Sequence, residues 1–148
     1  GKKSGHAEIE PFLAELYKLS NVHFLGSKSI AEMAAYPQHF DVCLMPYCVD
    51  DYTKYIDPLK LHEYLAGGQP VVGSNIPAFD EFRGVVAVAT SVDEWSSAIS
   101  RALDAPERTP ERRSARQAVA REYDWDVLVG KIAAVLLERL RGLEARSR

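Results

Sequence analysis

A lysine and a glutamate three positions apart give this sequence its clearest chemical potential. Lys60 and Glu63 lie in the segment 55–72, which reads YIDPLKLHEYLAGGQPVV. In a helix they share one face with Gly67. The free amides and positive dipole at the start of such a helix favour an anion, typically a phosphate, and Lys60 adds a point charge there. Glu63, one turn deeper, can accept hydrogen bonds from a diol such as ribose. The pattern therefore predicts a helix that grips both ends of a nucleoside diphosphate.

Plainer interpretations of the same residues stay open. Glu63 can pair with Lys60 within the helix, Lys60 can be a solvated surface residue, and His62 can have a structural or surface role. The pair Asp50-Asp51 is expected in a solvated loop and not at a metal. Cys43 is expected as a small buried hydrophobe. The histidines have no metal-ligand spacing, so no metal site is predicted.

The elements that position these residues alternate along the chain. Apolar periodicity predicts helices near 7–19, from 29, over 59–66, 92–103, 111–122 and 125–142, and strands at 22–25, 41–45, 70–73 and 85–89. Four strands that alternate with helices predict a parallel sheet with helices on both faces. Ligands of such sheets bind at the carboxyl ends of the strands, and the long loop 46–57 follows one of these ends.

Local signals predict where some of these elements begin and end. Asp57 suits an N-cap and Pro58 the first helical position, while Gly67-Gly68 ends the same helix. Ser91 is expected to cap a helix with Glu94 in a capping box. The strand 41–45 is nearly all apolar, which predicts burial on both faces.

Composition excludes several classes of protein. The chain has 148 residues, 47% hydrophobic, with a formal charge of −3. These values are ordinary for one globular domain and argue against a nucleic-acid binder. Two cysteines make no disulfide framework, so a reducing, cytoplasmic location is expected. The sequence has no apolar run of the roughly 18 residues that a membrane-spanning helix needs, and no signal-peptide pattern. Residues 101–148 hold 11 basic and eight acidic side chains, which indicates a solvated helical face or a surface for an anionic membrane.

The segment DPLKLHEYLAGGQPVV resembles the nucleotide-sugar binding segment of glycosyltransferases with the GT-B fold, in particular the group 1 enzymes that include retaining family 4. The upstream NVHFLG and FDVCLMPY are also similar, so the resemblance covers about residues 21–140. It implies an α/β fold, namely one Rossmann-like half of GT-B with a helical C-terminal tail. It also implies glycosyl transfer from a nucleoside-diphosphate sugar to an acceptor hydroxyl, in polysaccharide or glycoconjugate synthesis, without a metal or other cofactor.

The resemblance assigns roles to individual residues. Glu63 matches the second acidic residue of the E-x7-E motif, which binds the donor's ribose. The first acidic position falls on Tyr55, which is not a carboxylate, and Asp57 lies nearby at the wrong offset. The turn 26–28 matches the border of the nucleobase site. The implied donor-binding residues are Gly26, Ser27, Tyr55, Asp57, Pro58, Leu59, Lys60 and Glu63.

The start of the chain departs from the family pattern. From the resemblance we expect that the opening strand–helix unit, with its glycine-rich turn, is missing or reduced to residues 1–5, and that the N-terminal acceptor domain is not part of this chain. We therefore expect residues 1–148 to be a single donor-binding domain, inactive alone, whose partners are the nucleotide sugar and the missing domain. The alternative is a non-enzymatic flavodoxin-like or receiver-like interaction module. Base, sugar, acceptor, stereochemistry and oligomeric state are not specified by the sequence.

Overall fold

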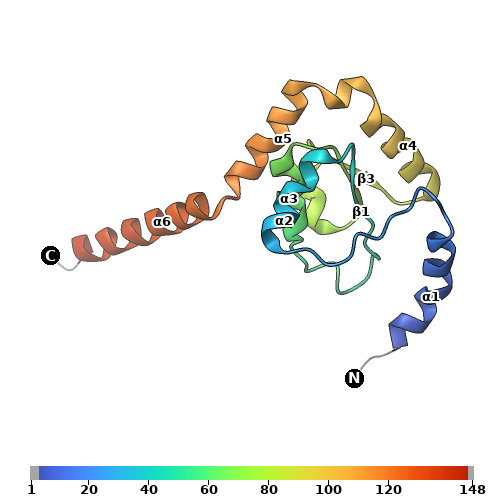
Figure 1. The fold of residues 1–148 in the computed structure, drawn as a ribbon. Helices are drawn as coiled ribbons and strands as arrows, with labels where there is room; N and C mark the ends of the chain where they lie inside the picture. The colour runs from blue at the N-terminus through green and yellow to red at the C-terminus, as the bar shows by residue number, and fades with distance from the viewer. Residues whose placement is uncertain (1–3, 147–148) are drawn as a thin grey trace. The chain divides into compact units, whose positions relative to one another are not determined.

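The computed structural model describes residues 4–146 (Figure 1). The chain divides into two compact units, Gly1–Ile30 and Ala31–Arg148. Gly1, Lys2 and Lys3, which belong to the reduced opening segment, lie outside the described residues.

The first unit contains one helix, α1 (Ser4–Tyr17), and an irregular segment that follows it. The rings of Tyr17 and Phe24 lie 4.3 Å apart. The strand expected at 22–25 is wrong, because these residues form no strand. An extended segment needs a partner for its backbone amides and carbonyls, and no strand in the described part of the chain pairs with it.

The second unit is built on a parallel sheet. Its strands are β1 (Cys43–Met45), β2 (Val71–Ser74) and β3 (Val86–Ala89), in the order β1-β2-β3. Cys43 pairs with Val71, and Val71 pairs with Val86. The parallel sheet and three of the four expected strands are therefore confirmed.

Five further helices and three short 3₁₀ helices complete the described fold. The α-helices are α2 (Ile30–Ala35), α3 (Leu59–Gly67), α4 (Val92–Leu103), α5 (Pro110–Glu122) and α6 (Trp125–Arg146). The 3₁₀ helices are Pro37–His39, Pro77–Phe82 and Ala105–Arg108. Helices α3 to α6 match the expected ones within a few residues.

Helices cover both faces of the sheet, as the alternation predicted (Figure 1). On one face, Val71 and Val86 pack with Leu61 and Leu65 of α3 and with Phe79. On the other face, the core consists of Val72, Ala89 and the α4 residues Ala98 and Ala102. Because side chains alternate along a strand, β2 and β3 each contribute to both cores. The fold is thus an α/β, Rossmann-like layer structure.

The strand 41–45 was expected to be buried on both faces, and Leu44 shows that this is wrong for one face of β1. Leu44 lies in the middle of β1, and 44% of it is exposed, whereas Cys43 and Met45 are buried. Leu44 pairs with Val72 and therefore shares the face that α4 covers. Helix α4 packs on β2 and β3, and β1 is at the edge of the described sheet, so this face of β1 is only partly covered.

Two local features are a cap at the start of α4 and a close contact inside β2. Ser91 and Glu94 form the expected capping box of α4, in which Ser91 Oγ accepts from the Glu94 amide at 3.3 Å. Gly73, in β2, lies under the ring of Phe79: a Cβ there would be 2.3 Å from Phe79 Cε2. Position 73 therefore admits no side chain unless Phe79 moves.

The end of α3 is held closely on two sides. Gly68 adopts a left-handed conformation (φ +77°), and its amide bonds to the carbonyl of Leu65. A Cβ at Gly68 would be 2.4 Å from Arg113 Cγ on α5, and one at Gly67 would be 3.2 Å from Pro37 Cβ. The two glycines thus end the helix, as predicted, and also allow its close approach to neighbours.

Helix α6 is amphipathic, as expected, but its apolar side chains are exposed. The exposed set is Trp125, Val127, Val129, Ile132, Val135, Leu136, Leu137, Leu140 and Leu143. Among the described residues, no helix is both long enough and apolar enough to span a membrane.

Candidate functional site

The carboxyl ends of the three strands define one edge of the sheet. Each leads into a connection: the loop 46–58 after β1, residues 75–76 after β2, and Thr90 after β3. Ser74, the last residue of β2, donates a hydrogen bond to the carbonyl of Tyr47, at 2.7 Å. This bond ties the start of the long loop to the neighbouring strand.

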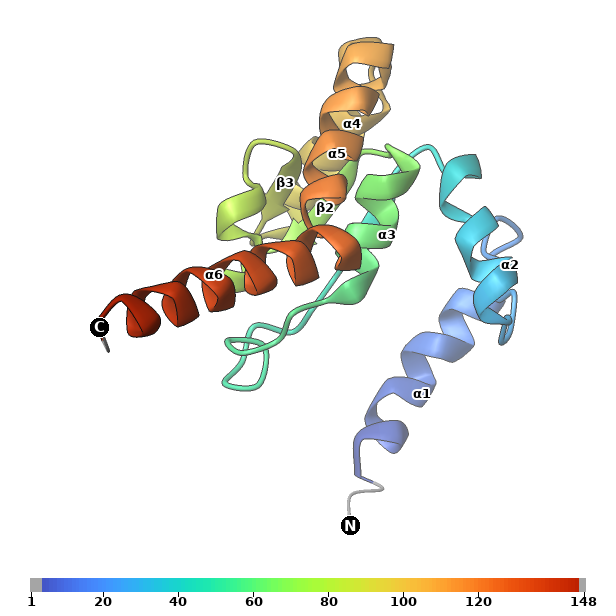
Figure 2. The same ribbon diagram turned by 90° about the vertical axis from the view of Figure 1, so that its left-hand side faces the viewer.

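The loop 46–58, which leads into α3 in Figure 2, is held by hydrogen bonds among its own residues. Thr53 is buried, and its amide donates to Asp50 Oδ1 at 2.9 Å while its Oγ1 accepts from the Asp50 amide at 2.9 Å. The hydrogen bond from the Thr53 amide lowers the pKa of Asp50. Asp51 pairs with Lys54 at 2.7 Å. Asp50 and Thr53 therefore close a turn in this loop. Sequence reasoning missed Thr53, although aspartate side chains commonly accept hydrogen bonds from nearby backbone amides in turns.

The entry into α3 differs from the expected one. The N-cap is Pro58, and Asp57 makes no capping hydrogen bond. The Asp57 carboxylate lies instead 3.6 Å from Nε2 of His62. The amide of Leu61 bonds to the Pro58 carbonyl at 2.8 Å, so the start of α3 presents the backbone amides of Leu59 and Lys60 without a capping side chain. This is the arrangement that favours an anion at a helix start.

Lys60 and Glu63 are both exposed on α3. Neither makes a hydrogen bond or an ion pair with the described residues, and the Lys60–Glu63 pair that would explain both structurally is absent there. With a separation of three residues they lie on one side of the helix, one turn apart. A cation near the helix start and a carboxylate one turn further are thus available to a ligand.

Glu63 borders a hollow of about 600 Å³ between α3, α5 and the start of α6. Asp57 and Leu59 line the same hollow, together with Tyr123, Trp125 and Leu128. The structure therefore brings three of the proposed donor-binding residues together, beside an apolar and aromatic wall. Pro58 is buried next to them, and Lys60 does not line the hollow.

His62 belongs to an aromatic cluster. Its ring lies 4.8 Å from that of Tyr123 and 5.7 Å from that of Phe82. Burial raises the pKa of Tyr123, as does a hydrogen bond to the carboxylate of Glu81. The structural role expected for His62 thus fits its position, but its partners are distant in sequence and no local pattern points to them.

The remaining proposed residues occupy separate places. Tyr55 lies in the loop before α3, and 87% of it is exposed. Gly26 and Ser27 belong to the first unit, between α1 and α2, and Gly26 has a φ of +70°. Their assignment to the sugar and the nucleobase stays a prediction. No group of three or more His, Cys, Asp or Glu residues able to hold a metal ion occurs in the part of the chain that the structure describes.

Comparison with known proteins places the chain in a family. The family model of the glycosyl transferases group 1 matches residues 1–105. A Bacillus subtilis (strain 168) protein named as a teichuronic acid biosynthesis glycosyltransferase, TuaH, is 42% identical over 64 residues. Those residues are 43% of this chain and only 16% of that relative. No solved structure matches. With the family match over more than two thirds of its length, and with its parallel α/β fold, this chain belongs to the glycosyl transferases group 1 family.

Proposed function

We propose that this chain is the donor-binding part of a glycosyltransferase that transfers a sugar from a nucleoside diphosphate to an acceptor hydroxyl. One observation carries the proposal: Lys60 and Glu63 are exposed and unpaired within the described chain, one turn apart at the start of α3. Family membership favours this function over a flavodoxin-like or receiver-like interaction module. The name of the matched relative supports a role in polysaccharide or glycoconjugate synthesis.

The proposed chemistry is electrostatic. As the bond between sugar and diphosphate breaks, negative charge grows on the departing diphosphate. The amides of Leu59 and Lys60 and the ammonium group of Lys60 stabilise that charge, which lowers the barrier. Glu63 accepts hydrogen bonds from the ribose hydroxyls and so orients the donor. In this scheme the acceptor is bound by a separate domain of the same enzyme, and this chain alone transfers no sugar.

Calorimetric titration with UDP and GDP tests the proposal. We expect one of the two nucleotides to bind, and both Lys60→Ala and Glu63→Gln to weaken it by about tenfold or more, because each removes a charged hydrogen-bonding group. Lys131→Ala and Glu111→Gln are matched controls, since both residues are exposed and lie on other helices. Nucleotide affinity that survives both α3 substitutions would show that the donor binds elsewhere.

A further inference from the structure

A second, smaller hollow lies at the amino ends of the strands, opposite to the candidate donor site. It has a volume of about 190 Å³ and is bordered by the starts of β2 and β3, the last turn of α4, and α5. Val71 and Val86, the first residues of these strands, line it. Since β2 and β3 are parallel, their amino ends lie together at this side of the sheet. The hollow is therefore distinct from the one beside Glu63.

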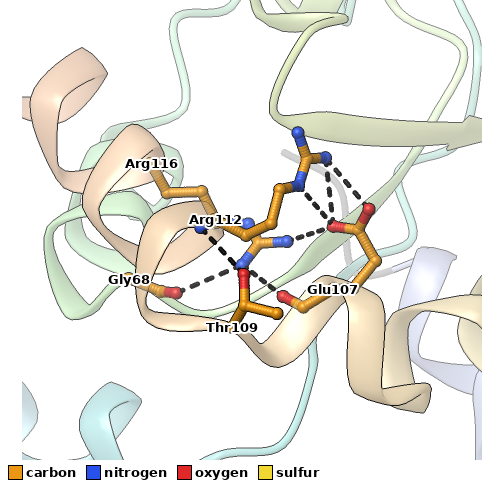
Figure 3. Close-up of polar contacts among 5 residues, drawn as sticks. All are labelled: Gly68, Glu107, Thr109, Arg112 and Arg116. Atoms are coloured by element: carbon orange, nitrogen blue, oxygen red, sulfur yellow. Dashed lines mark hydrogen bonds and ion pairs between the residues drawn. The ribbon is translucent and has the colours of Figure 1, made fainter.

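The charged lining of this hollow is strongly biased towards cations. Four arginines, Arg83, Arg101, Arg112 and Arg116, line it together with a single carboxylate, Glu107. Arg83 is paired with Asp80 at 2.8 Å, outside this lining. Arg112 binds Glu107 in a bidentate manner, with Nη2 3.0 Å from Oε1 and Nε 3.2 Å from Oε2. Arg116 Nη2 also donates to Glu107 Oε2 (Figure 3). One carboxylate thus serves two guanidinium groups, and the four arginines leave a net charge of +3 on the lining, or +2 without Arg83, which Asp80 neutralises.

Two of the arginines retain unused donors. Arg116 is only 2% exposed; its Nη1 donates to the carbonyl of Glu107 at 2.9 Å, but its Nε is buried without a partner. Burial lowers the pKa of Arg116, against the opposing effect of Glu107. The Arg101 side chain makes no hydrogen bond or ion pair with the described residues. Buried donors are normally satisfied, so Arg116 Nε points to a missing acceptor. Arg101 is exposed, and its guanidinium group is available to the same acceptor.

We propose that this hollow binds a phosphate group, held by Arg101 and Arg116. A tetrahedral oxyanion offers several acceptors to converging guanidinium groups, and such charge-assisted hydrogen bonds are strong. The volume is below the range of about 300–1,000 Å³ typical of pockets for small organic molecules. The site therefore accepts a single phosphate group, from the free ion or from the end of a phosphate monoester, and it is too small for a nucleotide. This inference is independent of the donor site proposed above.

Thermal shift and amide NMR titrations of the 148-residue chain test the site. Inorganic phosphate and glucose 1-phosphate are added separately, against nitrate at equal ionic strength. We expect phosphate to raise Tm and to shift amides around Arg101 and Val86 more than nitrate does. Equal effects of both phosphates indicate a site open to monoesters, and an effect of the inorganic ion alone indicates the free ion. Both results support the site, and no difference between either phosphate and nitrate overturns it.

Substitutions separate this site from the donor site. Arg101→Ala is expected to weaken phosphate binding about tenfold, because it removes one charged donor without breaking a bond in the described chain. Arg141→Ala, an exposed arginine on α6 that lines neither hollow, is the matched control and leaves the affinity unchanged. Lys60→Ala likewise leaves it unchanged. If Lys60→Ala abolishes the phosphate response and Arg101→Ala does not, the ion binds at the donor site and the proposal is wrong.

Discussion

Ser74, at the end of β2, donates a 2.7 Å hydrogen bond to the carbonyl of Tyr47, where the chain leaves β1. Ser74 is buried, so its hydroxyl has little access to water. The bond joins two adjacent strand ends at the edge where the ligand is expected, and it fixes the origin of the loop that leads to α3.

Removal of this bond is expected to lower stability. Ser74→Ala leaves the Tyr47 carbonyl without its donor and should reduce the free energy of unfolding by about 1–2 kcal/mol. Ser100→Ala is the control, since Ser100 is exposed and bonds only to Ser96 within its own helix. Urea denaturation of the two variants measures the difference, and equal losses would mean that the Ser74 bond has no special weight.

A side chain at position 73 is expected to disturb the core. In Gly73→Ala the new Cβ would lie 2.3 Å from the Phe79 ring, which must shift, and such overpacking costs about 1–3 kcal/mol. Gly84→Ala provides the comparison, because nothing lies within 4 Å of its Cβ position. Thermal unfolding should show a clear drop in Tm for the first variant and little change for the second. Similar Tm values would contradict the close contact.

The capping box of α4 predicts a dependence of stability on pH. Glu94 accepts hydrogen bonds from the Thr90 hydroxyl and from the amides of Thr90 and Ser91, and these lower its pKa below the ordinary value of 4.5. A carboxyl group with a lowered pKa stabilises the fold above its unfolded-state pKa, and this stabilisation disappears as pH falls through the folded-state pKa. Glu94→Gln should therefore be less stable than the parent at neutral pH and equally stable in strongly acidic buffer.

Unfolding experiments across the acidic range measure this effect. Asp93→Asn serves as the control, since Asp93 lies on the same helix turn outside the capping box. A stability difference between Glu94→Gln and the parent that stays constant down to strongly acidic pH would mean that ionisation of Glu94 is not responsible.

Glu107 is expected to be more important to stability than its partly exposed position indicates. Among the described residues it is the only carboxylate bound to the buried Arg116, and its removal leaves a buried cation whose described partners are carbonyls alone. Loss of one member of a buried ion pair costs about 3–5 kcal/mol, and we expect Glu107→Ala to fall near the lower end because Glu107 is partly solvated. Glu111→Ala, an exposed glutamate in the first turn of α5, should change stability by less than about 0.5 kcal/mol in the same denaturation assay.

Local sequence was sufficient where the determinants are close together. The α3 boundaries depend on a proline and two glycines within ten residues, and the α4 cap depends on Ser91 and Glu94. The candidate site residues Lys60 and Glu63 follow from helix periodicity and a family motif. These features could be predicted because each interaction involves neighbours in the chain.

Tertiary partners explain what the sequence did not reveal. Residues 22–25 have the composition of a strand, but a strand also needs a partner, and no local pattern specifies one. The charged residues of 101–148 were expected on a solvated helical face or a surface for an anionic membrane. This expectation is wrong for Arg116, which is buried. Its acceptors are the carboxylate and carbonyl of Glu107 and the carbonyl of Gly68, nine and 48 residues away. Such pairings depend on the packing of α5 against α3 and cannot be read from spacing.

The two ends of α3 differ in how closely the fold constrains them. Positions 67 and 68 lie against Pro37 and Arg113 and cannot gain a side chain without disturbance. Lys60 and Glu63 are exposed and make no hydrogen bond or ion pair with the described residues. Substitutions at Gly67 and Gly68 are therefore expected to destabilise the fold, whereas substitutions at Lys60 and Glu63 are not. Under the proposed function, substitutions of Lys60 and Glu63 should therefore change nucleotide binding with little penalty in folding.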